Sequence, residues 1–198
     1  MAAITPGGSG EARILHPGLC AAVLADAICT AAFRGERHEF RSRLDTVVQI
    51  LRLAVVSDAF LSQALYRLKA SLQRRGVPVL PRLLHRLAIA GAGIYIGDQA
   101  VVHPGIYIVH GQVVIEGPAE VFPGVVISPA VTIAGDAAGR APTIGRRASL
   151  GTGSRIIGDV TVGDRARIGA NAVVLQDVPD GATAVGIPAR IGAGSGPG

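Results

Sequence analysis

An aliphatic side chain recurs at every sixth position through most of the second half of the chain, with one seven-residue step and one eleven-residue step. The positions are Ile96, Val102, Ile108, Ile115, Val121, Ile127, Ile133, Ile144, Leu150, Ile156, Val162, Ile168 and Val174. Neither an α-helix, with a period of 3.6, nor an alternating strand, with a period of 2, has this spacing. A short fixed period indicates a solenoid, in which each repeat buries its apolar residue against the next coil.

Six residues per flat face predict a three-sided coil. The aliphatic side chains then stack into a narrow apolar column, while Gly, Asp, Asn and Arg occupy the corners. The hexads predict about four coils. Aromatic residues make up only 4% of the chain and glycine occurs 27 times, which suits a narrow interior with tight corners. We therefore predict a parallel β-helix in the form of a prism.

The residues before the prism have helical spacing instead. Amphipathic patterns predict helices over 17–33, 41–56 and 58–75, with Ser57 as the N-cap of the third. Pro81 opens a fourth helix, which ends before Gly91. The predicted organisation is a flexible N-terminus (1–12), an α-helical region (13–90), a β-helix domain (91–191) and a flexible tail (192–198).

Charge and cysteine content narrow the classes of function. Residues 1–90 hold 12 basic and 6 acidic residues, and residues 91–198 hold 7 and 8. Without a basic stripe interleaved with aromatic residues, this distribution does not favour nucleic-acid binding. The two cysteines, Cys20 and Cys29, give no disulfide framework, and the N-terminus lacks a signal-peptide pattern. The apolar stretch 19–32 contains Asp26 and is too short to span a bilayer, so we expect a cytoplasmic protein.

Both breaks in the six-residue spacing carry candidate chemistry. The longer break inserts a loop at 134–142, and insertions in solenoids often form functional sites. The shorter break contains His110, whose imidazole is suited to general-base catalysis. We expect the two breaks to border one cleft. His103 and His110 are the only histidines in the predicted prism, so a metal site, which needs a third ligand, is not expected.

Several segments resemble the bacterial serine O-acetyltransferase group of the hexapeptide-repeat, or left-handed β-helix, acyltransferases. The similarity covers about two thirds of the chain. The segments are Tyr66-Arg67, Ile-Tyr-Ile-Val-His-Gly at 106–111, Val-Thr-Ile at 131–133, Arg140-x-Pro142-x-Ile144, Ile-Gly-Ala-Asn-Ala-Val-Val at 168–174, Asp-Val-Pro at 177–179 and Val-Gly-Ile-Pro-Ala-Arg at 185–190. The resemblance implies a left-handed β-helix and an acyltransferase that uses acetyl-CoA and no metal.

The resemblance also implies roles for individual residues. His110 would be the catalytic base, while Arg140, Tyr95 and Asp45 stand at acceptor-binding positions. Acetyl-CoA would lie between neighbouring prisms of a homotrimer, which the helical region could double to a hexamer. Its contacts would be Ala134, Gly135, Gly151, Thr152, Gly153, Arg155, Arg167 and Arg190, with glycines admitting the pantetheine arm and arginines meeting phosphates.

Three positions depart from the pattern of the serine enzymes. The residue before the histidine is Val109 instead of aspartate, Tyr95 replaces an orienting aspartate, and Ala141 replaces the loop histidine. These departures predict a small hydroxyl- or amine-bearing acceptor other than free serine. Three alternatives stay open: a true serine O-acetyltransferase of cysteine biosynthesis, a non-catalytic trimeric scaffold, and an acyl carrier protein in place of CoA as donor.

Overall fold

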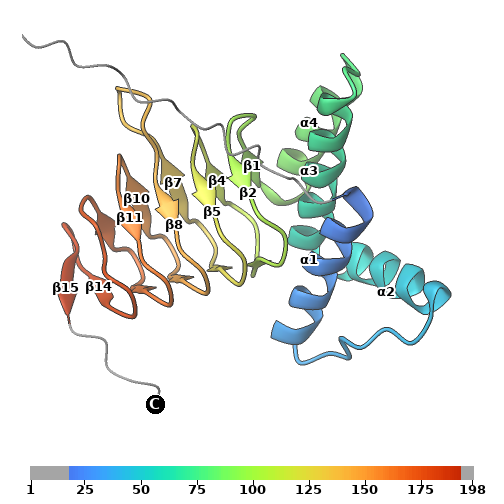
Figure 1. Ribbon diagram of the computed structural model, residues 1–198, viewed down its shortest axis with the longest axis horizontal. Coiled ribbons are helices and arrows are strands. Elements are labelled where there is room, and N and C mark those ends of the chain that lie inside the picture. Colours follow the sequence, from blue (N-terminus) through green and yellow to red (C-terminus); the bar gives the residue numbers. More distant parts are fainter. Residues whose placement is uncertain (1–17, 193–198) are drawn as a thin grey trace, which may run out of the picture.

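The structure, a computed structural model, describes residues 18–192 as four helices followed by a three-sided prism of short strands (Figure 1). The helices cluster at the end of the prism where its first coil lies, and β15 lies at the opposite end. The predicted flexible segments, 1–12 and 192–198, fall outside the described residues, except for Gly192 at the end of β15.

The four helices lie close to the ranges that the sequence predicts. They are α1 (Leu19–Phe33), α2 (Arg43–Val56), α3 (Asp58–Arg74) and α4 (Leu80–Ala92). The Ser57 hydroxyl accepts a hydrogen bond from the Phe60 N–H at 3.2 Å, which confirms the predicted N-cap of α3. Gly93 ends α4 with a left-handed backbone, φ +66°.

The strands form three parallel sheets, one for each face of the prism. Sheet A contains β1 (Tyr95–Ile96), β4 (Val114–Ile115), β7 (Thr132–Ala134), β10 (Arg155–Ile157) and β13 (Val173–Val174). Sheet B contains β2 (Val101–Val102), β5 (Glu120–Val121), β8 (Thr143–Ile144) and β11 (Thr161–Val162). Sheet C contains β3 (Tyr107–Ile108), β6 (Val126–Ile127), β9 (Ser149–Leu150), β12 (Arg167–Ile168), β14 (Thr183–Val185) and the antiparallel β15 (Arg190–Gly192). The parallel β-helix is confirmed.

The register explains the six-residue period. Ile115 pairs with Ile96 on one side and with Ile133 on the other, so aliphatic residues at equivalent positions stack through the prism. Ile115 and Ile133 are fully buried. A second buried row lies at the corners, at positions such as Ala119 and Val125. Burial of each large aliphatic side chain contributes about 1.5–3 kcal/mol.

The prism has about five coils, so the prediction of four was one short. Sheet A contains five strands, and the last belongs to a coil that leaves the six-residue spacing. In that coil Val178 follows Val174 by four positions and bridges to Val162, and the fully buried Ala184 takes the place of a large aliphatic residue. A period based on large aliphatic residues therefore cannot detect this coil.

Helix α3 closes the open end of the prism with hydrogen-bond donors. Outward-facing residues of the first coil pair with the second coil, as in the 2.8 Å bond from the Tyr95 N–H to the Val113 carbonyl. The carbonyls of inward-facing residues such as Ile96 point the other way, toward the helices. Side chains of α3 bond to these carbonyls: Lys69 to Ile96 at 3.0 Å, Tyr66 to Ala100 at 3.1 Å, Arg67 to Val102 and to His103 (2.9 Å), and Gln63 to Ile106 at 3.3 Å. These bonds satisfy buried acceptors that have no strand partner.

A buried ion pair fixes α1 to the same junction. Arg67 Nε donates to Asp26 Oδ2 at 2.8 Å, and the two side chains are 7% and 1% exposed. Asp26 Oδ1 accepts the Gly105 N–H at 2.8 Å, which ties the pair to the first coil. Burial raises the pKa of Asp26, while Arg67 and the Gly105 N–H oppose that rise.

We predict that Arg67→Ala lowers the free energy of unfolding by about 3–5 kcal/mol, because it leaves a buried carboxylate without its partner. Chemical denaturation monitored by circular dichroism measures the change. Arg74→Ala removes an exposed arginine of the same helix and should cost less than about 1 kcal/mol. Equal stability of the two variants would contradict the role given to the ion pair.

Candidate active site

His110 lies at the corner where sheet C passes into sheet A. This corner, called the His110 corner here, comprises residues 109–113, 128–131, 151–154 and 169–172 of successive coils. Backbone hydrogen bonds join its levels, from the Gly153 N–H to the Pro129 carbonyl at 2.9 Å and from the Asn171 N–H to the Thr152 carbonyl at 2.8 Å. Residues of this corner therefore form a continuous ridge along the prism.

An open groove of about 520 Å³ adjoins His110. The start of α3, the end of α4 and the His110 corner form its walls, and its lining residues are Asp58, Ala59, Gly91, Ala92, Gly93, His110, Gly111, Gln112 and Pro129. The His110 side chain is exposed and makes no hydrogen bond with any other residue in the range 18–192. Its imidazole is thus free to accept a proton from a group bound in the groove.

Gly111 brings the His110 corner against the end of α4. A Cβ at this position would lie 1.7 Å from the Ala92 carbonyl oxygen, so no larger residue fits without a backbone shift. The adjacent Gln112 N–H donates to the same carbonyl at 2.8 Å. The missing side chain therefore determines how close His110 lies to the helical wall of the groove.

Neither position expected to orient His110 supplies a carboxylate. Val109 precedes it and is half-buried. Tyr95 is half-buried in β1 and packs edge to face against His85 of α4, with ring centroids 5.0 Å apart. The Tyr95 ring thus contacts the helical region, and Tyr95 does not line the His110 groove.

The loop 134–142 lies at a different corner, where sheet A passes into sheet B. Within one chain the two breaks in the period therefore do not border one cleft, contrary to our expectation. Asp136 organises the loop, since its carboxylate accepts the N–H groups of Ala138 at 2.9 Å and Arg140 at 3.0 Å. Sequence spacing could not reveal this separation, because it does not show which corner each break occupies.

Arg140 is already paired with two carboxylates. Its guanidinium donates to Asp136 at 2.6 and 3.0 Å and to Asp159 at 3.2 Å, and its side chain is 62% exposed. The Arg140 N–H, followed by the Arg140 guanidinium and the Ala138 N–H, holds the pKa of Asp136 below its usual range. Ala141, in place of the expected histidine, is partly buried and packs toward Gly117 and Gly135. The bonds to Asp136 and Asp159 use three of the five guanidinium N–H groups, so two remain for an acceptor carboxylate.

The residues expected to bind acetyl-CoA are distributed over several faces. Gly151, Thr152 and Gly153 belong to the His110 corner, and Arg155 follows them as an exposed residue at the start of β10. Ala134 and Gly135 lie at the loop corner instead. The exposed Arg167 and Arg190 lie on β12 and β15 of sheet C. Packing within this chain also requires glycine at position 151, because a Cβ there would lie 2.7 Å from the backbone nitrogen of Ala170.

Asp45 has a local role in the helical region. Its carboxylate pairs with the Arg37 guanidinium at 2.6 and 3.0 Å and accepts the Arg41 N–H at 2.9 Å. These bonds lower the pKa of Asp45. They connect the segment before α2 to the first turn of that helix, so Asp45 is engaged within the helical region and not with the His110 groove.

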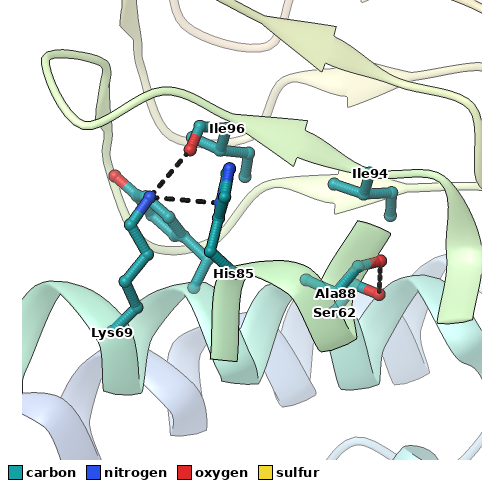
Figure 2. Close-up of a pocket in the computed structure, with 7 residues that line it drawn as sticks. Ser62, Lys69, His85, Ala88, Ile94 and Ile96 are labelled. Atoms are coloured by element: carbon teal, nitrogen blue, oxygen red, sulfur yellow. Dashed lines mark hydrogen bonds between the residues drawn. The ribbon is translucent and has the colours of Figure 1, made fainter. Parts of the chain in front are cut away.

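Sequence reasoning missed the polar face of α3 and the cluster around Lys69, the one lysine of the chain. Figure 2 shows Lys69 Nζ between the Ile96 carbonyl at 3.0 Å and His85 Nδ1 at 3.3 Å, in a pocket of about 10 Å³ between α3, α4 and the first coil. Burial and the Lys69 ammonium lower the pKa of His85, consistent with a neutral ring that accepts at Nδ1. A pocket of this size has room for no more than about one water, so we interpret its residues as structural.

Comparison with known proteins decides the family. Residues 141–176 match the family described as "Bacterial transferase hexapeptide (six repeats)". A serine acetyltransferase of Helicobacter pylori strain J99 is 42% identical over 129 residues, which are 63% of this chain and 75% of that protein. This chain belongs to the serine acetyltransferase family.

Solved structures agree with that assignment. Neisseria gonorrhoeae serine acetyltransferase in complex with serine superposes with a TM-score of 0.73 at 25% identity, over 87% of this chain and 68% of that one. A serine acetyltransferase in complex with CoA superposes with a TM-score of 0.70 at 26% identity, over 89% of this chain and 70% of that one. The predicted acetyl-CoA-dependent acyltransferase is confirmed at the level of the family, and the scaffold alternative gains no support.

Within the described range, no three His, Cys, Asp or Glu side chains gather as a metal site would require. None of the described helices has the length and apolar character needed to cross a bilayer.

We predict that Gly111→Ala disrupts the His110 groove, because its methyl group would overlap the Ala92 carbonyl oxygen. The expected cost is about 2 kcal/mol or more of stability, measured by thermal unfolding, with a loss of turnover. Gly91→Ala is the matched control: it lines the same groove, but its added Cβ meets nothing within 4 Å, so stability should be retained or slightly increased. If Gly111→Ala kept the stability and turnover of the wild type, the close packing of Gly111 against the Ala92 carbonyl would be refuted.

Proposed function

We propose that this protein transfers the acetyl group of acetyl-CoA to the hydroxyl of L-serine. The exposed His110 imidazole beside an open groove carries the proposal, because the transfer needs a base within reach of the acceptor hydroxyl. His110 accepts the hydroxyl proton as the oxygen attacks the thioester carbonyl. The C–S bond then breaks, the His110 imidazolium returns the proton to the departing sulfur, and O-acetylserine and the CoA thiol are released, with no covalent enzyme intermediate. The names of the relatives favour serine over the other acceptors that the sequence predicted.

The donor is proposed to lie along the His110 corner. Gly151, Thr152 and Gly153 lie on the same ridge as His110, and the two glycines leave room for a pantetheine arm whose thioester would point toward the imidazole. Arg155 is exposed just beyond them and can pair with a phosphate. Backbone N–H groups near the reacting carbonyl would stabilise the negative charge that develops on its oxygen.

A complete site is proposed to need two chains. His110 and the loop 134–142 lie at different corners of one prism, so they can face each other only across an interface between neighbouring copies. A closed threefold ring gives three equivalent sites of this kind. Its contacts would bring Arg140, Ala134 and Gly135 of one chain toward the His110 groove of the next. Exposed apolar residues of α2, including Leu44 (80%) and Val55 (84%), are available to join two trimers into a hexamer.

A second candidate acceptor is a less polar hydroxyl or amine compound. Val109 and Tyr95 occupy the positions where the resemblance expects aspartates, and Ala141 occupies that of a histidine. With these three uncharged residues, the proposed acceptor site has fewer charged groups than the binding of a free amino acid would require. CoA remains the proposed donor in both cases, with an acyl carrier protein as the alternative donor.

The test of the proposed function is release of CoA thiol from acetyl-CoA, with L-serine compared against a panel of amino acids, amino sugars and hydroxy acids. We predict that L-serine is acetylated and that His110→Ala lowers kcat by about 10²–10⁴, while CoA affinity is retained. Preferred turnover of another acceptor would select the second candidate. Wild-type rates for His110→Ala would show that His110 is not the base.

Mixed trimers test the shared site. His110→Ala and Arg140→Ala proteins, each impaired alone, are unfolded together and refolded as a mixture. If a site joins His110 of one chain to Arg140 of the next, about a quarter of the sites in random trimers contain both native residues. We therefore predict recovery of roughly that fraction of wild-type kcat. A site built within one chain would recover nothing, because every chain carries one substitution. Light scattering checks that each variant forms the same oligomer.

A further inference from the structure

Asp58 is the one carboxylate among the residues that line the His110 groove. It lies in the first turn of α3 and is exposed. Its carboxylate forms no hydrogen bond or ion pair with another residue of the range 18–192. No lysine or arginine lines this groove either, so Asp58 determines the sign of its fixed charge.

The local structure does not need the Asp58 carboxylate. The neighbouring Ser57 caps α3, because its hydroxyl accepts the Phe60 N–H at 3.2 Å. The Ser57 carbonyl accepts the Leu61 N–H at 3.0 Å and begins the helical ladder. A carboxylate in the first turn also interacts favourably with the helix dipole, but that contribution is typically below about 1 kcal/mol. The side chain is therefore available for a ligand.

We propose that Asp58 binds the ammonium group of the acceptor while the acceptor hydroxyl lies at His110. The inference rests on the proposed function and deepens it, since it specifies an amine-bearing acceptor. An amino acid that enters the groove carries an ammonium group, and a carboxylate on the wall of the groove can form a charge-assisted hydrogen bond with it. Val109 and Tyr95 carry no such charge, whereas Asp58 lines the wall formed by the start of α3.

The small residues around Asp58 support this arrangement. Gly91, Ala92 and Gly93 form the wall at the end of α4, so no bulky side chain occupies the space near His110. With a volume of about 520 Å³, the groove has room for an amino acid together with the end of a pantetheine arm. In this arrangement Asp58 contributes to acceptor specificity, and His110 contributes the chemistry.

The experiment compares two acceptors that differ only in the amine. L-Serine and 3-hydroxypropionate share a hydroxyl and a carboxylate, but only L-serine carries an ammonium. Asp58→Asn, which keeps the shape and removes the charge, should raise KM for L-serine about 10–100-fold with kcat nearly unchanged. Its kcat/KM for 3-hydroxypropionate should stay within about threefold of wild type. Asp58→Glu should restore part of the preference for L-serine.

Glu39→Gln is the matched control, because it removes an exposed carboxylate of the helical region that does not line the groove. Equal losses with both acceptors in Asp58→Asn would indicate a structural role and overturn the proposal. An unchanged KM for L-serine would also overturn it. Thermal unfolding of all variants shows whether folding is retained.

Calorimetric binding of L-serine separates this proposal from the proposed function. Suppose that L-serine binds to the wild type, does not bind to Asp58→Asn, and is not acetylated by either protein. This result would support Asp58 as an ammonium site and would reject serine acetylation as the function. If the acceptor panel finds a better acceptor, the same comparison is made with that compound. The Asp58 site would be rejected if the preferred acceptor has no amine. It would also be rejected if L-serine binds to neither protein and no acceptor is turned over.

Discussion

The inward-facing residues of the first coil have main-chain carbonyls that point away from the second coil, where no preceding coil supplies N–H donors. In each later coil, the carbonyls of the equivalent inward-facing residues accept N–H groups from the coil before, as the Val113 carbonyl accepts the Tyr95 N–H. Leaving buried carbonyls unpaired costs on the order of 1–3 kcal/mol each. Helix α3 solves this problem with long polar side chains, and the Arg67–Asp26 pair adds α1 to the same junction. The helical region is thus an integral part of the prism.

This junction also determines where the candidate site lies. Because Gln63, Tyr66, Arg67 and Lys69 fix the position of α3 against the first coil, the start of that helix has a defined place. The start of α3 and the end of α4 form one wall of the groove, and His110 lies on the other. The residues that stabilise the end of the prism therefore also position the acceptor region, although none of the four lines the groove.

The sequence predicted the architecture well because the dominant interaction is local and periodic. One aliphatic residue per hexad was enough to place most strands, and Ser57 and Pro81 marked helix starts. The sequence did not reveal the last coil, where Val178 and Ala184 leave the period, or the donors of α3, whose partners lie more than 25 residues away.

For the candidate site, the sequence singled out His110 and Arg140 but did not show that they lie at two different corners. It also could not show that Arg140 already pairs with Asp136 and Asp159, because such pairing depends on folded geometry.

The two ends of the prism are closed in different ways, by α3 at the first coil and by the antiparallel strand β15 at the last. An exposed parallel edge is a template for another chain, and β15 covers the final edge of sheet C. Because neither closure depends on the middle coils, the length of the prism is free to vary without a new solution for its ends. Insertion or deletion of a whole coil between them would keep both junctions. The fold can therefore evolve longer or shorter donor-binding ridges as a modular change.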